Sequence, residues 1–162
     1  MTLQGEMRVR IWDVEYVSCP FLCHHLTGYA DRLAMSYSGC TDNWTPSGCI
    51  TEELGRDRLD YLFITNADQD HMSDLQGLWD AGIFVPVLYR NPSHTAEQIL
   101  DIKRLSGRLT RDAERYVVSC AQFNHPVVEP FDQYMGGITA RVFWNPYPFF
   151  RKTNDLSLVI FI

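Results

Sequence analysis

Apolar and polar positions along this chain alternate between two spacings, and each spacing predicts a type of element. Short runs rich in β-branched and aromatic residues, such as residues 59–65, are typical of largely buried strands. After that run, Met72, Leu75 and Leu78 recur at the spacing of one helix face. Strands are predicted over residues 7–13, 19–24, 32–37, 59–65, 83–89, 138–144 and 156–162, and helices over residues 46–54, 71–80, 94–105 and 110–123. Strands followed by strand–helix units predict a layered α/β fold.

A cluster of polar residues lies between the fourth predicted strand and the second predicted helix. Asn66, Asp68, Asp70 and His71 follow one another closely there. In open α/β sheets ligands gather at the carboxyl ends of strands, and a helix N-terminus or a divalent cation would stabilise the two carboxylates. In one interpretation Asp68 and Asp70 cap the helix and His71 is a side chain of its first turn. In the other, Asp68, Asp70 and His71 hold one metal ion.

The sequence LDYLFITNADQDHMSDLQGLW around this cluster resembles the metallo-β-lactamase fold, especially its bacterial branch related to competence-type hydrolases. The family pattern is a strand, then Thr-His-x-His-x-Asp-His, then a helix. Asn66 and Asp68 stand where the family has its first two histidines, while Asp70 and His71 match the last two ligands. The resemblance therefore implies a metal motif that keeps about half of its ligands.

Three further stretches carry the same resemblance. MRVRIWDVEYVSC is similar to the opening strand of the family with its Asp-Val turn, RLAMSYSGCTDNW to its third strand and the following loop, and TNDLSLVIFI to the strand that begins the second half of the fold. The remaining metal ligands of the family, a Gly-Asp pair and further histidines, lie beyond the position matched by Ile162. The resemblance implies that residues 1–162 form a single truncated domain, a partial metallo-β-lactamase-like sandwich of a mixed sheet with helices packed on it.

The ligand types limit which metal this motif suits. Catalytic zinc usually takes three protein ligands and keeps one position open for water. Asp70 and His71 supply two ligands and Asp68 a third, whereas the amide of Asn66 is a poor zinc ligand. Magnesium or manganese would suit Asp68, Asp70 and the Asn66 carbonyl better. We expect no bound cofactor, with a single zinc, manganese or magnesium ion as the alternative.

Composition and charge narrow the function classes. The net charge is −6 and the basic residues form no run, which argues against a nucleic-acid groove. The sequence contains no apolar run of membrane-spanning length and no signal-peptide pattern at its start, so we expect a cytoplasmic protein without a membrane partner. An odd number of cysteines, five, favours reduced thiols over a disulfide framework.

The end of the sequence predicts a surface for another protein. LSLVIFI is a strongly apolar strand whose edge and face would need a cover, which strand pairing in a homodimer or docking onto another protein would provide. The preceding segment has the aromatic density of an interface core. The expected partner-binding residues are Phe143, Trp144, Tyr147 and Phe149, together with Trp44 in the loop before the first predicted helix. For Trp44 the alternative is an indole packed against the core.

Two functions follow from these features. The one we favour is a catalytically degenerate scaffold that binds a protein; its size and degeneracy suit an inhibitor carried by a phage or mobile element, such as an anti-CRISPR protein. The alternative is a metal-dependent hydrolase of phosphoesters or other esters, in which a metal held by Asp68, Asp70 and His71 activates water. In that case Asp70 would be the essential catalytic carboxylate.

Overall fold

The computed structural model describes residues 5–14, 17–125 and 140–161. Its larger sheet has five strands in the order β1-β2-β3-β4-β5. These strands are β1 (Gly5–Val14), β2 (Val17–Leu26), β3 (Arg32–Ser36), β4 (Tyr61–Phe63) and β5 (Val87–Tyr89). The first three pair antiparallel, whereas β3–β4 and β4–β5 pair parallel. The sheet is therefore mixed, and each strand lies in or over a range predicted from the sequence.

A second sheet contains β6 (Arg141–Trp144) and β7 (Leu158–Phe161), which pair antiparallel and which we call the ribbon. Of the strands predicted here, residues 138, 139 and 162 lie outside the described residues. A turn of 3-10 helix over Asn154–Leu156 precedes β7, so this strand begins later than the predicted residue 156.

The helices follow the predicted ranges with one interruption. They are α1 (Pro46–Gly48), which continues as a π-helical turn over Cys49–Glu53, a 3-10 turn over Gln69–His71, α2 (Leu75–Asp80), α3 (Ala96–Ser106) and α4 (Arg111–Gln122). Thr95 and Gln98 form a capping box at α3, and the hydroxyl of Thr110 caps α4. No helix within the described ranges is long and apolar enough to cross a membrane.

The helix predicted over residues 71–80 is wrong in its first half. The backbone N–H of Asp74 donates to the carbonyl of Ser38 (2.8 Å), and the Asp74 carboxylate accepts from the N–H of Ser47 (2.7 Å). These contacts with the loop after β3 and with α1 hold Asp74 outside helical geometry, with φ −118° and ψ 17°. The regular helix consequently begins only at Leu75.

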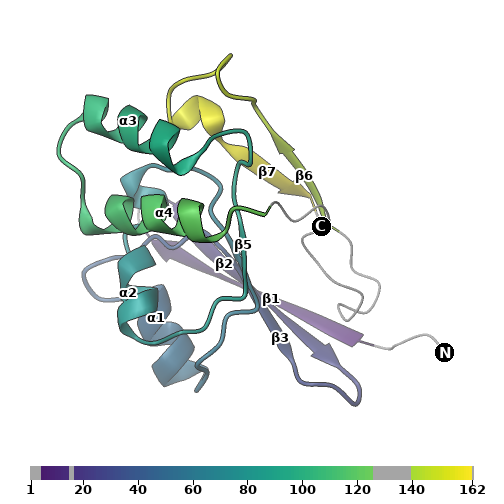
Figure 1. Ribbon diagram of the computed structural model, residues 1–162. Helices are drawn as coiled ribbons and strands as arrows, with labels where there is room; N and C mark the ends of the chain where they lie inside the picture. The colour runs from purple at the N-terminus through teal and green to yellow at the C-terminus, as the bar shows by residue number, and fades with distance from the viewer. Residues whose placement is uncertain (1–4, 15–16, 126–139, 162) are drawn as a thin grey trace.

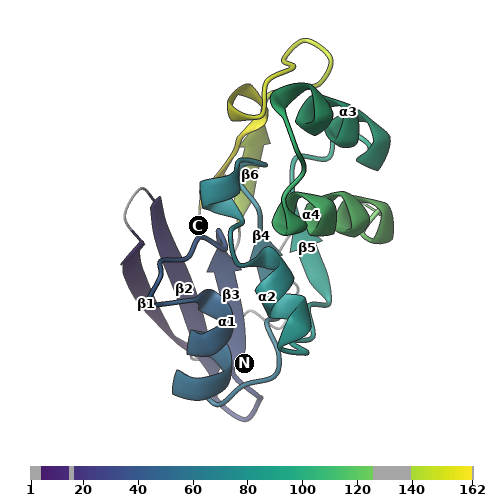
Figure 2. The ribbon, with the colours of Figure 1, turned by 90° about the vertical axis from the view of Figure 1, so that its left-hand side faces the viewer.

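The elements form three layers (Figure 1). The four α-helices lie on one face of the five-stranded sheet, and the ribbon lies on the other, as the turned view also shows (Figure 2). One apolar core lies between helices and sheet and includes Phe21, Leu62 and Tyr116. A smaller core lies between sheet and ribbon and includes Phe63 and Leu158. The fold thus belongs to the α/β class, as the hydrophobic pattern predicts.

The amino ends of β3 and β4 are joined by the carboxylate of Asp60. It accepts hydrogen bonds from Arg58 Nε (2.6 Å), Arg32 Nη1 (2.9 Å) and the backbone N–H of Leu33 (2.9 Å). Burial by itself raises the pKa of Asp60, but these hydrogen bonds together hold that pKa below its usual value. The charged network therefore fixes one end of the sheet, and the candidate site lies at the other.

Candidate functional site

The carboxyl ends of β3 and β4 lie side by side because the two strands are parallel and Ser36 pairs with Phe63. The N–H of Tyr37 donates to the carbonyl of Phe63 (2.9 Å), and the N–H of Ser38 donates to the carbonyl of His71 (2.9 Å). The loop after β3 is thereby fixed against the turn that follows β4. This arrangement places the polar cluster predicted from the sequence at the carboxyl edge of the sheet.

Asp70 and His71 lie next to each other at this edge. Asp70 Oδ2 is 3.5 Å from His71 Nε2, and Thr65 Oγ1 is 3.5 Å from His71 Nδ1. The ring of Tyr37 packs on the imidazole with 4.8 Å between the ring centroids. Tyr37 has a φ of 69°, a left-handed conformation that is unusual for a bulky residue and that marks this loop as constrained. No pattern in the sequence predicted a role for Tyr37 at this site.

Asp68 turns away from this pair toward α3. Its Oδ1 lies 3.6 Å from Lys103 Nζ, and the Lys103 side chain is largely buried. Burial lowers the pKa of Lys103, while the charge of Asp68 acts in the opposite direction. Asp68 precedes the 3-10 turn over Gln69–His71, and Asp74 precedes α2. Neither side chain makes a capping hydrogen bond to the helical segment that follows it. The capping role expected for Asp68 is therefore wrong, because its carboxylate pairs with an ammonium group instead.

Asn66 connects this turn to the segment that precedes β7. Its side chain is buried, and its Nδ2 donates to Asn154 Oδ1 (2.7 Å) and to Asp68 Oδ2 (3.3 Å). The amide that stands at a histidine position of the resembling family thus has a structural role here. It joins the turn after β4 to the segment between β6 and β7.

The three predicted metal ligands are only partly brought together. The side chains of Asp70 and His71 lie next to each other, whereas the carboxylate of Asp68 pairs with Lys103. Within the described residues, no three side chains of histidine, cysteine, aspartate or glutamate are grouped so that they could share an ion. Metal binding by Asp68, Asp70 and His71 stays a prediction.

A cleft of about 570 Å³, which we call the α3 cleft, opens beside Asp68. It lies between α3 and the segment that leads from β6 to β7. Its lining residues are Asp68, Gln98, Asp101, Ile102, Leu105, Ser106, Tyr147, Arg151, Lys152, Thr153 and Asn154. The only two lysines of the chain, Lys103 and Lys152, both belong to this region, one paired with Asp68 and one in the cleft wall.

The predicted partner-binding residues fall in different places. Trp44 stacks on Trp12 with 5.4 Å between ring centroids and packs against the helix-side core, as the alternative of a packed indole predicts. Phe143 and Trp144 lie on the ribbon with exposed rings. Tyr147 lines the α3 cleft, and Phe149 is 86% exposed on the same connecting segment.

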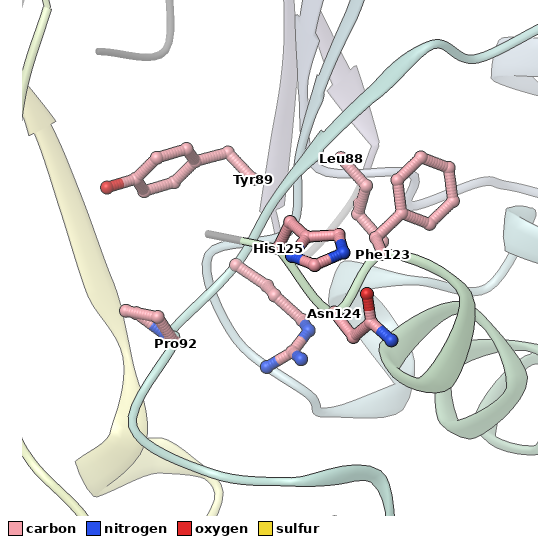
Figure 3. Close-up of a pocket in the computed structure, with 7 residues that line it drawn as sticks. Leu88, Tyr89, Pro92, Phe123, Asn124 and His125 are labelled. Carbon is pink, nitrogen blue, oxygen red and sulfur yellow. The ribbon is translucent and has the colours of Figure 1, made fainter. Parts of the chain in front are cut away.

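A second hollow, of about 40 Å³, lies between β5 and the end of α4 (Figure 3). It has room for only a few water molecules. Its walls include Leu88, Phe123 and Arg90, and Figure 3 shows Tyr89 pointing to the other side of β5. The guanidinium of Arg90 donates to the backbone carbonyls of Asn91, His94 and Cys120. Because these contacts tie α3 and α4 to β5, we assign Arg90 a structural role.

Comparison of the chain with protein-family models, with curated proteins and with solved structures found no significant match.

Proposed function

We propose that this protein acts by binding another protein through the α3 cleft and that it is not an enzyme. The observation that carries the proposal is the exposure of Leu105 and Phe149. They are 90% and 86% exposed, more than any other large apolar side chain of the described residues. Leu105 lines the cleft, and Phe149 lies on the segment that forms the opposite wall. Apolar side chains exposed around one cleft are typical of an interaction site.

The walls of the cleft suit a polypeptide segment. Ile102 and Leu105 provide apolar area on the α3 side, where Asp101 also lines the cleft. Arg151 and Lys152 add two cations from the opposite wall. A peptide that carries an apolar anchor beside charged residues of both signs would therefore find complementary groups.

The pairing of Asp68 with Lys103 supports a role without catalysis. An ammonium group held on α3 supplies the positive charge that a metal ion would otherwise bring to this carboxylate. Asn66 is likewise engaged with Asn154 and Asp68. The polar residues of the degenerate motif are thus used to join parts of the chain.

The resemblance to a catalytically degenerate metallo-β-lactamase fold belongs to the same proposal. What supports it is the order of the layers, with helices on one face of a mixed sheet and a second, smaller sheet on the other. The narrower role of an inhibitor of bacterial defence, such as an anti-CRISPR protein, stays a prediction from chain length and motif degeneracy. Protection of phages in a host that carries the defence system would test it.

The direct test is co-purification from the native host with three variants. A partner should accompany the wild-type chain in stoichiometric amounts and should be lost with Leu105→Ser/Phe149→Ser. The matched controls are Val118→Ser, which removes an exposed apolar group from α4, and Asp70→Ala/His71→Ala. Both controls should retain the partner. Loss of the partner with the Asp70 and His71 variant but not with the cleft variant would contradict the proposal.

The alternative function, a metal-dependent hydrolase, is favoured by the proximity of Asp70 and His71 at the carboxyl edge of the sheet. Elemental mass spectrometry on protein purified without chelator tests it. Stoichiometric zinc, manganese or magnesium in the wild type, lost in His71→Ala, would favour hydrolysis of a phosphoester. Absence of metal from both proteins would favour the binding function.

A further inference from the structure

The surface of the sheet opposite the helices has the form of a step. The ribbon covers the part of this face built by β2 to β5, where Val142, Leu158 and Ile160 pack on the second core. Nothing among the described residues covers β1 on the same face. There the side chains of Met7, Val9 and Ile11 are exposed. We call these three residues, together with Pro20 of β2, the shelf.

The strand register places the shelf and the ribbon on the same side of the sheet. Val9 pairs with Leu22, and Ile11 pairs with Pro20, so each pair shares one face. Leu22 belongs to the core under the ribbon. A groove of about 370 Å³ runs between the two surfaces, with Val9 in its floor and Val159 in its wall. The ribbon therefore stands about 10 Å above the shelf, the usual distance between packed sheets.

The outer face of the ribbon is apolar as well. Phe143 pairs with Val159, and Arg141 pairs with Phe161, and both pairs point away from the five-stranded sheet. Phe143, Val159 and Phe161 are each more than half exposed. We call these three residues the ribbon face. Each chain thus carries a raised apolar surface beside a lowered one.

We propose that a second copy of this chain occupies the shelf, so that the ribbon face of each copy packs on the shelf of the other about a two-fold axis. The ribbon of one copy rises above the sheet by the same distance as the shelf of the other copy lies below its own ribbon. The two surfaces are therefore complementary when one copy is rotated by 180°, which is the condition for an isologous interface. The two ribbons would then lie together in one middle layer between two five-stranded sheets. This inference concerns the sheet face away from the helices and does not depend on the α3 cleft.

The exposed area favours a second copy as the occupant. The six apolar side chains of β1 and the ribbon face expose on the order of 600 Å² per copy, close to the roughly 800 Å² that each partner contributes to a stable interface.

Sedimentation equilibrium with the full chain tests the proposal at about 100 µM, above the micromolar Kd expected for an interface of this size. We expect a species of twice the chain mass of 18.8 kDa. Ile11→Lys and Val159→Asp should each weaken the dimer by about 100-fold or more, because each buries an unpaired charge in an apolar contact. Val118→Lys, on the helix layer, is the matched control and should remain dimeric. An unchanged thermal transition by circular dichroism would show that the variants fold.

Mixing the two monomeric variants identifies the contact. If the shelf of one copy faces the ribbon of the other, the mixture contains one native contact and one lysine–aspartate contact, and heterodimers should form. A ribbon-to-ribbon dimer would instead leave Ile11→Lys dimeric, which would overturn the proposed arrangement. A wild-type monomer at this concentration would overturn the second copy as occupant, leaving binding at the α3 cleft to be judged by its own test.

Discussion

The Lys103 ammonium lies 3.6 Å from the Asp68 carboxylate, and this contact joins the last turn of α3 to the turn after β4. The two residues are far apart in the sequence, and Asp68 also lines the α3 cleft. The pair therefore links the stability of the fold to the shape of the proposed binding site.

Replacement of Lys103 by methionine should destabilise the protein by about 2 kcal/mol, because Asp68 loses its partner while remaining largely buried. Lys152→Met is the matched control, since Lys152 is exposed, and it should change the free energy of unfolding by less than about 0.5 kcal/mol. Urea denaturation measures both. Equal effects of the two substitutions would show that the ion pair contributes nothing specific.

The buried His94 should make stability depend on pH. Burial, aided by the charge of Arg90, lowers its pKa from 6.5 to about 4. The unfolded chain therefore binds this proton at a higher pH than the folded chain does. Neutral His94 therefore contributes about 3 kcal/mol to the free energy of unfolding. This contribution is fully present above about pH 6.5 and decreases as the pH falls toward 4. In His94→Gln the slope of unfolding free energy against pH should flatten between these values, whereas His125→Gln, at an exposed position, should keep it.

Gly77→Ala should destabilise the protein although alanine favours helices. A Cβ at this position would lie 1.9 Å from Asp74 Oδ1, and that carboxylate is held by the N–H of Ser47. We expect a loss of about 1–3 kcal/mol from this overlap. The double variant Asp74→Ala/Gly77→Ala removes the clash, so its loss measured by thermal or urea unfolding should be smaller than the sum of the single losses.

Trp44 and Phe149, both aromatic candidates for partner binding, should behave in opposite ways. Trp44→Ala removes the ring stacked on Trp12 and should cost about 3 kcal/mol. Phe149→Ala removes a ring that is almost fully exposed and should change the free energy of unfolding by less than about 0.5 kcal/mol. Chemical denaturation of the two variants distinguishes a core residue from a surface residue.

The hydrophobic pattern was sufficient to predict the elements, because strands and helices are set largely by local spacing and caps. For example, α4 spans Arg111–Gln122, within the predicted range 110–123. The helix predicted from residue 71 failed where a contact between distant residues prevailed. Asp74 is held by Ser38 and Ser47, which no periodicity in the sequence reveals.

The same limit applies to the candidate site. The sequence predicted where Asp68, Asp70 and His71 lie in the fold, because a polar cluster that follows a buried strand must lie at the carboxyl edge of the sheet. It did not predict that Asp68 would pair with Lys103, or that Tyr37 would pack on His71, because each contact joins different elements. Nor could composition distinguish the packed Trp44 from the exposed Phe149.

The two cores depend on different parts of the chain, which has a consequence for synthesis on the ribosome. Within the part of the chain that the structure describes, every buried member of the helix-side core precedes Phe123, whereas the core under the ribbon requires Ala140 and Leu158. The helix side can therefore form first, while the opposite face of the sheet waits a few seconds for the ribbon at ordinary rates of translation. During that interval the nascent chain presents the apolar side chains of Leu22 and Phe63 to its surroundings. We expect this to be the stage at which chaperones engage the chain.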